Sequence, residues 1–210
     1  MFLSGRLEAR LADTAEELAG IGPEVGYHAA DIGNPGEAEQ LVEAALTRFP
    51  DLGVLINNAS ILGKRAPIDK VDTHTWDEVI RINTSSLFYV TRPLIPALVK
   101  RGEGSIINVS SGVGRKGKPN WGPYAVSKFG VEGFTQVLAE ELRPHGIRVN
   151  SVNPAGTRTE MRASAYPDED PLTLPTPEDI APVFVYLASD QSKDMTGLAY
   201  EARDYIKERS

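Results

Sequence analysis

Cysteine is absent from the 210-residue sequence, and histidine is scarce. The absence of cysteine excludes disulfide bonds and thiolate-bound zinc, and it is compatible with a reducing compartment. The three histidines, His28, His74 and His145, are scattered without the spacing of metal ligands, and no carboxylate cluster accompanies them. We therefore expect no catalytic metal.

Long apolar runs are also missing. No stretch of about 18 apolar residues occurs, and the first residues carry no basic segment followed by an apolar one, so neither a membrane span nor a secretory signal is predicted. The net charge of -7 repels polyanions, so neither nucleic acid nor an anionic membrane is an expected partner. The composition predicts a soluble, cytoplasmic protein that acts on small molecules.

Helical and strand-like patterns alternate along the chain, which is 41% hydrophobic and suits a single domain, 1–210. Period-3.6 patterns predict helices, and short apolar runs predict strands, over these segments: helices 7–19, 34–49, 75–100, 124–143 and 177–188, and strands 25–29, 53–57, 105–110 and 147–152. The alternation is typical of an α/β fold, a doubly wound parallel sheet covered on both faces.

Two regions depart from regular structure. Pro93 and Pro96 are expected to bend or interrupt the helix over 75–100. Residues 154–176, rich in proline, threonine and acids, read as an irregular segment of the kind that often covers a site. Within it, 168–170 is an acidic turn that is either simply solvated or repels acidic substrates.

The strongest chemical signal is a tyrosine and a lysine four residues apart at the start of a predicted helix. Tyr124 and Lys128 share one helix face, and the ammonium is expected to favour the phenolate and lower the pKa of Tyr124. The alternative is a surface pair with a snorkelling lysine. Ser111, thirteen residues earlier, follows the strand 105–110, where open α/β sheets bind ligands, although a lone serine is often a cap or turn residue. The combination favours a catalytic site.

A Gly-x-Gly-x-x-Gly pattern spans 112–117 and invites a phosphate-binding interpretation. That fingerprint requires the glycines to open directly into a helix, whereas Lys-Pro-Asn-Trp follows here. We therefore interpret 112–117 as the loop between Ser111 and Tyr124. Arg115, Lys116 and Lys118 are expected to be solvated, and no phosphate cradle is expected in this chain.

Taken in order, these motifs resemble the short-chain dehydrogenase/reductase family, and the resemblance covers essentially the whole chain. It implies a catalytic tetrad of Asn83, Ser111, Tyr124 and Lys128. Asn83 alone could be an ordinary helix residue whose side chain faces solvent or bonds to the backbone. The segments Gly-Arg-x-Gly-x-x-Asn-Trp-Gly and Thr-Arg-Thr-x-Met-Arg-Ala-Ser-Ala resemble an uncharacterised bacterial oxidoreductase branch of the family without a settled substrate.

The resemblance also implies a nicotinamide cofactor, NADP or NAD. Asp31 resembles the acid that contacts adenine, and Asn57 and Asn58 follow a strand as cofactor contacts or merely as strand-end caps. Arg6 favours NADP over NAD because a guanidinium accommodates the extra phosphate, unless it merely snorkels. The full expected cofactor set is Arg6, Asp31, Asn57, Asn58, Ala59, Tyr124, Lys128, Pro154, Thr157 and Thr159.

Departures from the family pattern matter equally. Ser60 and Ala155 stand where the family has glycine, and the family's opening strand and glycine-rich turn have no counterpart before Gly5. In the family's strand order 3-2-1-4-5-6-7, we expect the first βα unit and most of the second strand to be lacking, with Phe2–Ser4 as a stub. We expect such an N-terminally truncated domain to be unstable. An added upstream segment of about 40 residues is expected to restore solubility and cofactor binding together.

The resemblance implies an NAD(P)-dependent enzyme that interconverts an alcohol and a carbonyl by hydride transfer. Ser111 and Tyr124 would bind the carbonyl, Tyr124 would donate its proton, and Lys128 would hold the nicotinamide ribose. The alternative is an impaired, truncated subunit that acts only as a dimerisation partner. In both cases the helices over 75–100 and 124–143 are expected to form a four-helix interface in a homodimer or homotetramer.

Overall fold

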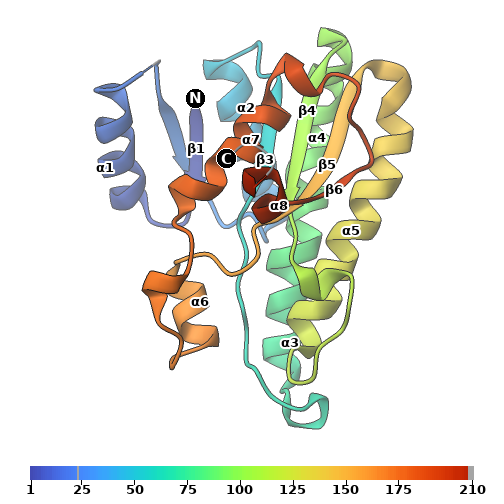
Figure 1. Cartoon of the computed structure of the whole chain (residues 1–210). Coiled ribbons are helices and arrows are strands. Elements are labelled where there is room, and N and C mark those ends of the chain that lie inside the picture. Colours follow the sequence, from blue (N-terminus) through green and yellow to red (C-terminus); the bar gives the residue numbers. More distant parts are fainter. Residues whose placement is uncertain (23, 208–210) are drawn as a thin grey trace.

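The computed structural model describes residues 1–22 and 24–207 (Figure 1). The strands are β1 (Phe2–Gly5), β2 (Gly26–Ala29), β3 (Val54–Asn57), β4 (Gly104–Val109), β5 (Ile147–Asn153) and β6 (Ala199–Glu201). The helices are α1 (Glu8–Ala19), α2 (Pro35–Arg48), α3 (Thr73–Ile80), α4 (Ser86–Arg101), α5 (Gly122–Leu142), α6 (Glu160–Ala165), α7 (Pro177–Ala188) and α8 (Ala202–Lys207). The predicted alternation of strands and helices is confirmed.

All strand pairings among the described residues are parallel, and they form two sheets, β1-β2 and β3-β4-β5-β6. On one face of the sheet, Ile106 of β4 and Val149 of β5 pack with α2, α4 and α5. On the other face, Ile107 and Val152 of the same two strands pack with α7 and α8. Successive strand residues point to opposite faces, so each central strand supplies both layers. The doubly wound α/β fold is therefore confirmed.

The amino-terminal strand is longer than expected. Phe2–Gly5 forms four parallel pairs with Gly26–Ala29, so the strand extends one residue beyond the expected Phe2–Ser4. Strands β1 and β3 are not paired with each other. Ile56 on β3 is 44% exposed, and Leu11 is the buried residue of α1, whereas Leu7, the residue before this helix, is 58% exposed.

The long helical region is interrupted at a different place from the one predicted. A π-helical turn, Arg81–Ser85, separates α3 from α4, whereas α4 continues through both Pro93 and Pro96. Buried Leu94 and Leu98 pack this helix against the sheet, and tertiary packing of this kind outweighs the backbone hydrogen bonds that proline removes. The prediction that the prolines interrupt the helix is therefore wrong.

The loops at the carboxyl ends of the strands extend into the lower half of Figure 1, where α3 and α6 lie. The segment 154–176, expected to be irregular, contains α6 and one 3-10 turn, Pro171–Thr173. No helix in the described part of the chain is both long and apolar enough to cross a membrane. This edge of the sheet, with its long loops, holds the residues expected at the site.

Candidate active site

The loop that follows β4 brings Ser111 against the start of α5. A 3-10 turn, Gly112–Gly114, begins directly after Ser111, and the chain then runs through an irregular stretch to Gly122, where α5 begins. A Cβ on Gly114 would lie 2.8 Å from the main-chain carbonyl carbon of Lys128. The glycine thus permits close approach of the loop to α5. As expected, 112–117 does not open directly into a helix.

Tyr124 lies in the first turn of α5 and is 8% exposed. Burial raises the pKa of Tyr124, because the phenolate would lose its hydration, while the neighbouring hydroxyls of Ser111 and Ser60 act to lower it by less. The prediction that the pKa of Tyr124 is lowered is therefore wrong for this structure. At neutral pH the side chain is a protonated phenol, which is the form that can donate a proton.

Lys128 lies one turn further along α5 and is 2% exposed. Its Nζ donates a hydrogen bond to the carbonyl oxygen of Val109, 2.8 Å away, and lies 5.6 Å from the centre of the Tyr124 ring. Burial lowers the pKa of Lys128 to about 8, and the charge of Glu132 acts in the opposite direction. The alternative of a snorkelling surface pair is excluded, since both side chains are buried.

Asn83 lies in the π-helical turn and is fully buried. Its Nδ2 donates to the carbonyl oxygen of Ile61 (2.8 Å) and to Ser127 Oγ (3.1 Å), and its Oδ1 accepts from the Ile61 N–H (2.8 Å). Ser127 Oγ in turn donates to the carbonyl oxygen of Tyr124 (2.7 Å). Asn83 thus does not face solvent; it bonds to the backbone of Ile61, as the structural alternative allows, and joins the loop after β3 to α5 through Ser127. π-helical turns often occur at functional sites.

Ser60 is a site residue that the sequence analysis recorded only as a departure from the family's glycine. Its Oγ lies close enough to Tyr124 to lower the pKa of the phenol, but it does not meet the geometry of a hydrogen bond. Neither Ser60 Oγ nor Ser110 Oγ has a hydrogen-bond partner in the described part of the chain, although both atoms are buried. Buried hydroxyls without partners are costly, and a bound ligand can satisfy them.

The expected cofactor residues Arg6 and Asp31 lie at neighbouring strand ends. Asp31 accepts hydrogen bonds from the Arg81 guanidinium and from the Gly33 N–H, both at 2.9 Å. Burial acts to raise the pKa of Asp31, but these two bonds and the charges of Arg81 and Arg6 hold it below its usual value. The carboxylate is therefore ionised, and it also ties β2 to the π-helical turn that contains Asn83.

In the Asn57-Asn58-Ala59 segment, the Asn57 side chain is hydrogen-bonded inside the protein, whereas Asn58 and Ala59 are exposed. Asn57 Nδ2 donates to Asn108 Oδ1 (2.9 Å), and Asn108 Nδ2 donates to Thr135 Oγ1 (2.9 Å), so the Asn57 amide belongs to a polar network that crosses from β3 to α5. This matches the structural alternative for Asn57. Asn58 and Ala59 are exposed at the end of the strand, where a ligand can reach them.

The segment after β5 carries the remaining expected cofactor residues, Pro154, Thr157 and Thr159. Thr157 is buried and donates to the carbonyl oxygen of Pro154 (3.1 Å), while Thr159 caps α6 by accepting from the Arg162 N–H (3.2 Å). Ala155 has φ of +59°, a left-handed conformation that favours glycine. Ala155, which stands where the family has glycine, therefore holds a strained backbone conformation.

The charges expected to be solvated are engaged. Arg115 forms ion pairs with Glu132 and Glu201, and Lys118 donates a hydrogen bond to the Tyr166 hydroxyl (2.7 Å). Arg115, Lys116 and Lys118 are nevertheless exposed, in agreement with the expectation that these charges are solvated, and Arg115 and Lys118 pair in addition with side chains of α5, β6 and the residue after α6.

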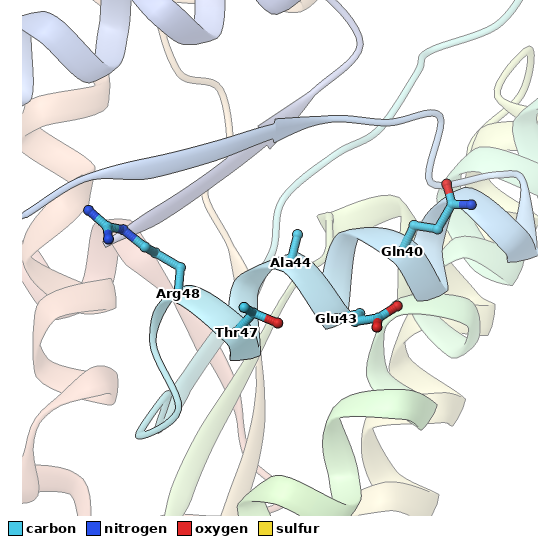
Figure 2. A pocket seen from close by; sticks show the side chains of 5 residues that line it. All are labelled: Gln40, Glu43, Ala44, Thr47 and Arg48. Atoms are coloured by element: carbon cyan, nitrogen blue, oxygen red, sulfur yellow. The ribbon is translucent and has the colours of Figure 1, made fainter.

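A hollow elsewhere on the surface lies along α2. Figure 2 shows its side chains, all from one helix: Gln40, Glu43, Ala44, Thr47 and Arg48. None of the expected site residues lines it. Among the described residues, no group of three or more histidine, aspartate or glutamate side chains is suited to hold a metal ion.

The family model for short chain dehydrogenases matches residues 1–170. The chain belongs to the short-chain dehydrogenase family. It is 43% identical over 165 residues to the uncharacterized oxidoreductase YciK of Escherichia coli K12, an alignment that covers 79% of this chain and 65% of that protein. The chain thus spans less than two thirds of the length of this relative. The resemblance to an uncharacterised bacterial branch of the family is confirmed.

Solved structures of short-chain dehydrogenases share the same architecture. One from Shigella flexneri 2a, complexed with NADP, has a TM-score of 0.92 and 39% identity, over 96% of this chain and 85% of that chain. One from Escherichia coli CFT073, complexed with NADPH, gives the same four values. Within the fold of this family, Ser111, Tyr124 and Lys128 are brought together around the end of β4, and Asn83 is linked to them through Ser127.

Proposed function

We propose that the protein is an NADP-dependent oxidoreductase that interconverts an alcohol and a carbonyl group of a small molecule. The observation that carries this proposal is a buried, protonated Tyr124 flanked by the Ser111 and Ser60 hydroxyls, with the Lys128 ammonium below it. A phenol in this state can donate a proton to a developing alkoxide. The bound NADP and NADPH of two similar structures favour this cofactor over NAD.

The residues along the carboxyl edge of the sheets fit a dinucleotide. Arg6 is exposed beside Asp31 and can accommodate the phosphate that distinguishes NADP. The buried hydroxyl of Ser110 has no hydrogen-bond partner in the described part of the chain. The residues proposed to hold the cofactor are Arg6, Asp31, Asn58, Ala59, Tyr124, Lys128, Pro154, Thr157 and Thr159. When bound, the nicotinamide supplies or accepts the hydride.

The proposed proton chemistry uses this chain's own groups. The hydroxyls of Ser111 and Tyr124 bind the substrate oxygen, and Tyr124 donates its proton as that oxygen gains negative charge. Lys128, with its pKa lowered to about 8, is still mostly protonated at neutral pH, and its charge, 5.6 Å from the centre of the Tyr124 ring, would stabilise the phenolate that proton donation leaves. Asn83 positions the loop after β3 against α5. General acid catalysis of this kind contributes about 10²- to 10⁴-fold.

Self-association through α4 and α5 is part of the proposal. Phe88 on α4 and Phe129 on α5 are each about half exposed, at 49% and 48%, and Val126 and Val137 add further exposed apolar surface on α5. Exposed apolar side chains that share adjacent helices often mark an interface. Light scattering is expected to detect a dimer or tetramer. The substitution Phe129→Glu is expected to shift the oligomeric state toward the monomer.

Two measurements test the function directly. NADPH binding, followed by calorimetry, separates an enzyme from a dimerisation partner that has lost cofactor binding. Reduction of a panel of aldehydes and ketones is expected to fall at least 10²-fold in Tyr124→Phe, with the melting temperature retained, because the phenol proton is removed without changing the ring. Near-normal turnover by Tyr124→Phe would disprove the assigned role, and absence of NADPH binding would favour the partner alternative.

A further inference from the structure

Beside Tyr124 lies a group of stacked cationic and aromatic side chains, here called the cationic cluster: Arg65, Lys118, Trp121, Arg162 and Tyr166. The Arg65 guanidinium lies 4.8 Å from the ring centres of both Trp121 and Tyr166. The Arg162 guanidinium lies 3.9 Å from the Tyr166 ring, and Lys118 Nζ donates to the Tyr166 hydroxyl. The cluster unites three separate segments: the loop after β3, the loop before α5, and α6 with the residue that follows it.

The cluster carries positive charge that the neighbouring acids do not neutralise. Glu169 forms a two-pronged ion pair with Arg162, at 2.5 and 2.6 Å. Arg65 and Lys118 form no ion pair with any carboxylate in the described part of the chain. Two cations thus remain without a carboxylate partner in a protein whose net charge is -7. The Lys118 hydrogen bond and the charges of Lys118, Arg162 and Arg65 act together on Tyr166, whose pKa they lower.

In the acidic turn 168–170, Glu169 is the residue that forms an ion pair with the cluster. The Glu169 carboxylate is paired with the Arg162 guanidinium. The Asp170 side chain accepts a hydrogen bond from the Leu172 N–H and thereby caps a 3-10 turn. The interpretation of this turn as simply solvated is therefore wrong for Glu169. The turn instead supports the cluster by holding Arg162 over the Tyr166 ring.

The cluster is continuous with the surroundings of Tyr124. The Trp121 and Tyr124 rings are in edge contact, with centres 5.7 Å apart, and both side chains are buried. The half-buried side chains of Leu62, Val113 and Met161 pack against the same group. Arg65 and Lys118 are exposed, so both cations face solvent only one aromatic ring away from the proposed proton donor.

We propose that the cationic cluster binds an anionic group of the substrate, a carboxylate or phosphate, while Tyr124 acts on its carbonyl; this inference rests on the proposed function. Arg65 Nη1 donates to the Ala165 carbonyl oxygen, and its Nε and Nη2 make no hydrogen bond within the described residues. A stacked guanidinium with free donor groups suits the planar, two-pronged recognition of such anions. The lowered pKa of Tyr166, caused first by the Lys118 hydrogen bond and then by the charges of Lys118, Arg162 and Arg65, is consistent with this positive field.

A matched set of three aldehydes tests the preference. We compare kcat/KM with NADPH for para-carboxybenzaldehyde, para-formylphenyl phosphate and the neutral methyl ester of the first compound. The parent protein is expected to prefer one or both anions over the ester by about tenfold, as one charged hydrogen bond can supply. Arg65→Gln/Lys118→Gln should abolish that preference and leave the ester rate within about twofold. The relative rates of the two anions distinguish carboxylate from phosphate.

Lys64→Gln is the matched control, because it removes an exposed charge one residue away, near Asp72, outside the cluster. It should retain the preference for anions. Equal turnover of anions and ester by the parent protein, or equal losses for both in the double variant, would overturn the inference and leave the proposed function intact.

Binding without turnover separates the two proposals. In a Trp76→Phe background Trp121 is the single tryptophan, and its fluorescence reports on the neighbouring Arg65. Benzoate is expected to quench it saturably and benzamide to have little effect, with the benzoate response lost in the double variant. Benzoate binding without reduction of any aldehyde would support the anion site and refute the proposed function. Equal responses to benzoate and benzamide would refute the anion site.

Discussion

The Lys128 ammonium donates its hydrogen bond to the carbonyl oxygen of Val109, 2.8 Å away where β4 ends, while its charge lies 5.6 Å from the Tyr124 ring centre. The side chain is thus anchored to the sheet rather than to the phenol. Because this anchoring takes place in a buried setting, it places an ammonium where few water molecules can hydrate it. The buried ammonium of Lys128 therefore lowers the stability of the fold at a position where the proposed chemistry uses its charge.

Lys128→Met is expected to raise the melting temperature at pH 7 while abolishing reduction of carbonyl compounds. The folded pKa of about 8 lies below the ordinary value of 10.5, so the charged form is disfavoured on folding. The resulting destabilisation is fully present below pH 8 and disappears as the pH rises toward 10.5. Calorimetric melting should therefore show a larger advantage of the variant at pH 7 than at pH 10. A variant that melts below the parent protein at pH 7 would contradict this.

Ser60→Gly, which restores the family's residue, is expected to raise the pKa of Tyr124 further, because the Ser60 hydroxyl acts to lower it. Carbonyl reduction needs protonated Tyr124 and declines as the pH rises through its pKa, so the alkaline limb of kcat/KM should move to higher pH. Ser111→Ala should move the limb in the same direction and also reduce kcat. An alkaline limb that stays in place or moves to lower pH in Ser60→Gly would show that Ser60 does not act on the phenol.

Ala155→Gly is expected to maintain or raise stability. The φ of +59° at Ala155 is unfavourable for an L-residue by about 1–2 kcal/mol, whereas glycine adds about 0.4–1 kcal/mol of unfolded-state entropy. The net gain lies between about 0 and about 1.6 kcal/mol, which corresponds to a rise of up to about 3–6 °C in the melting temperature. Ala163→Gly, on an exposed position of α6, is the control and should lower it. Destabilisation by Ala155→Gly as large as that of the control would contradict the strain.

Amide hydrogen exchange should reveal unequal stability of the two sheets. Strands β1 and β2 pair only with each other, whereas β4 and β5 lie inside a four-stranded sheet with fully buried Ile107 and Val149. A two-stranded ladder opens at lower free energy than a sheet interior. We expect amides of β1 and β2 to exchange much faster than those of β4 and β5, as measured by mass spectrometry. Equal protection would show that the two sheets unfold as one unit.

The order of helices and strands could be read from the sequence because hydrophobic periodicity depends on local spacing. The same is true of the Tyr124 and Lys128 pair, since residues four apart in a helix share a face, and of Ser111 after its strand. That 112–117 does not open directly into an α-helix was also readable, because Lys-Pro-Asn-Trp follows it. Each of these features depends only on residues that lie close together in the sequence.

The tertiary structure alone decided how each site group behaves. Burial, which no spacing reports, raises the pKa of Tyr124 and lowers that of Lys128, reversing the expectation that the lysine would acidify the phenol. Likewise, Asn83 reaches Ile61 and Ser127, and Arg65 lies between Trp121 and Tyr166, only because distant segments fold together. Solvation and long-range contacts depend on where the whole chain places each group, so they could not be read from the local sequence.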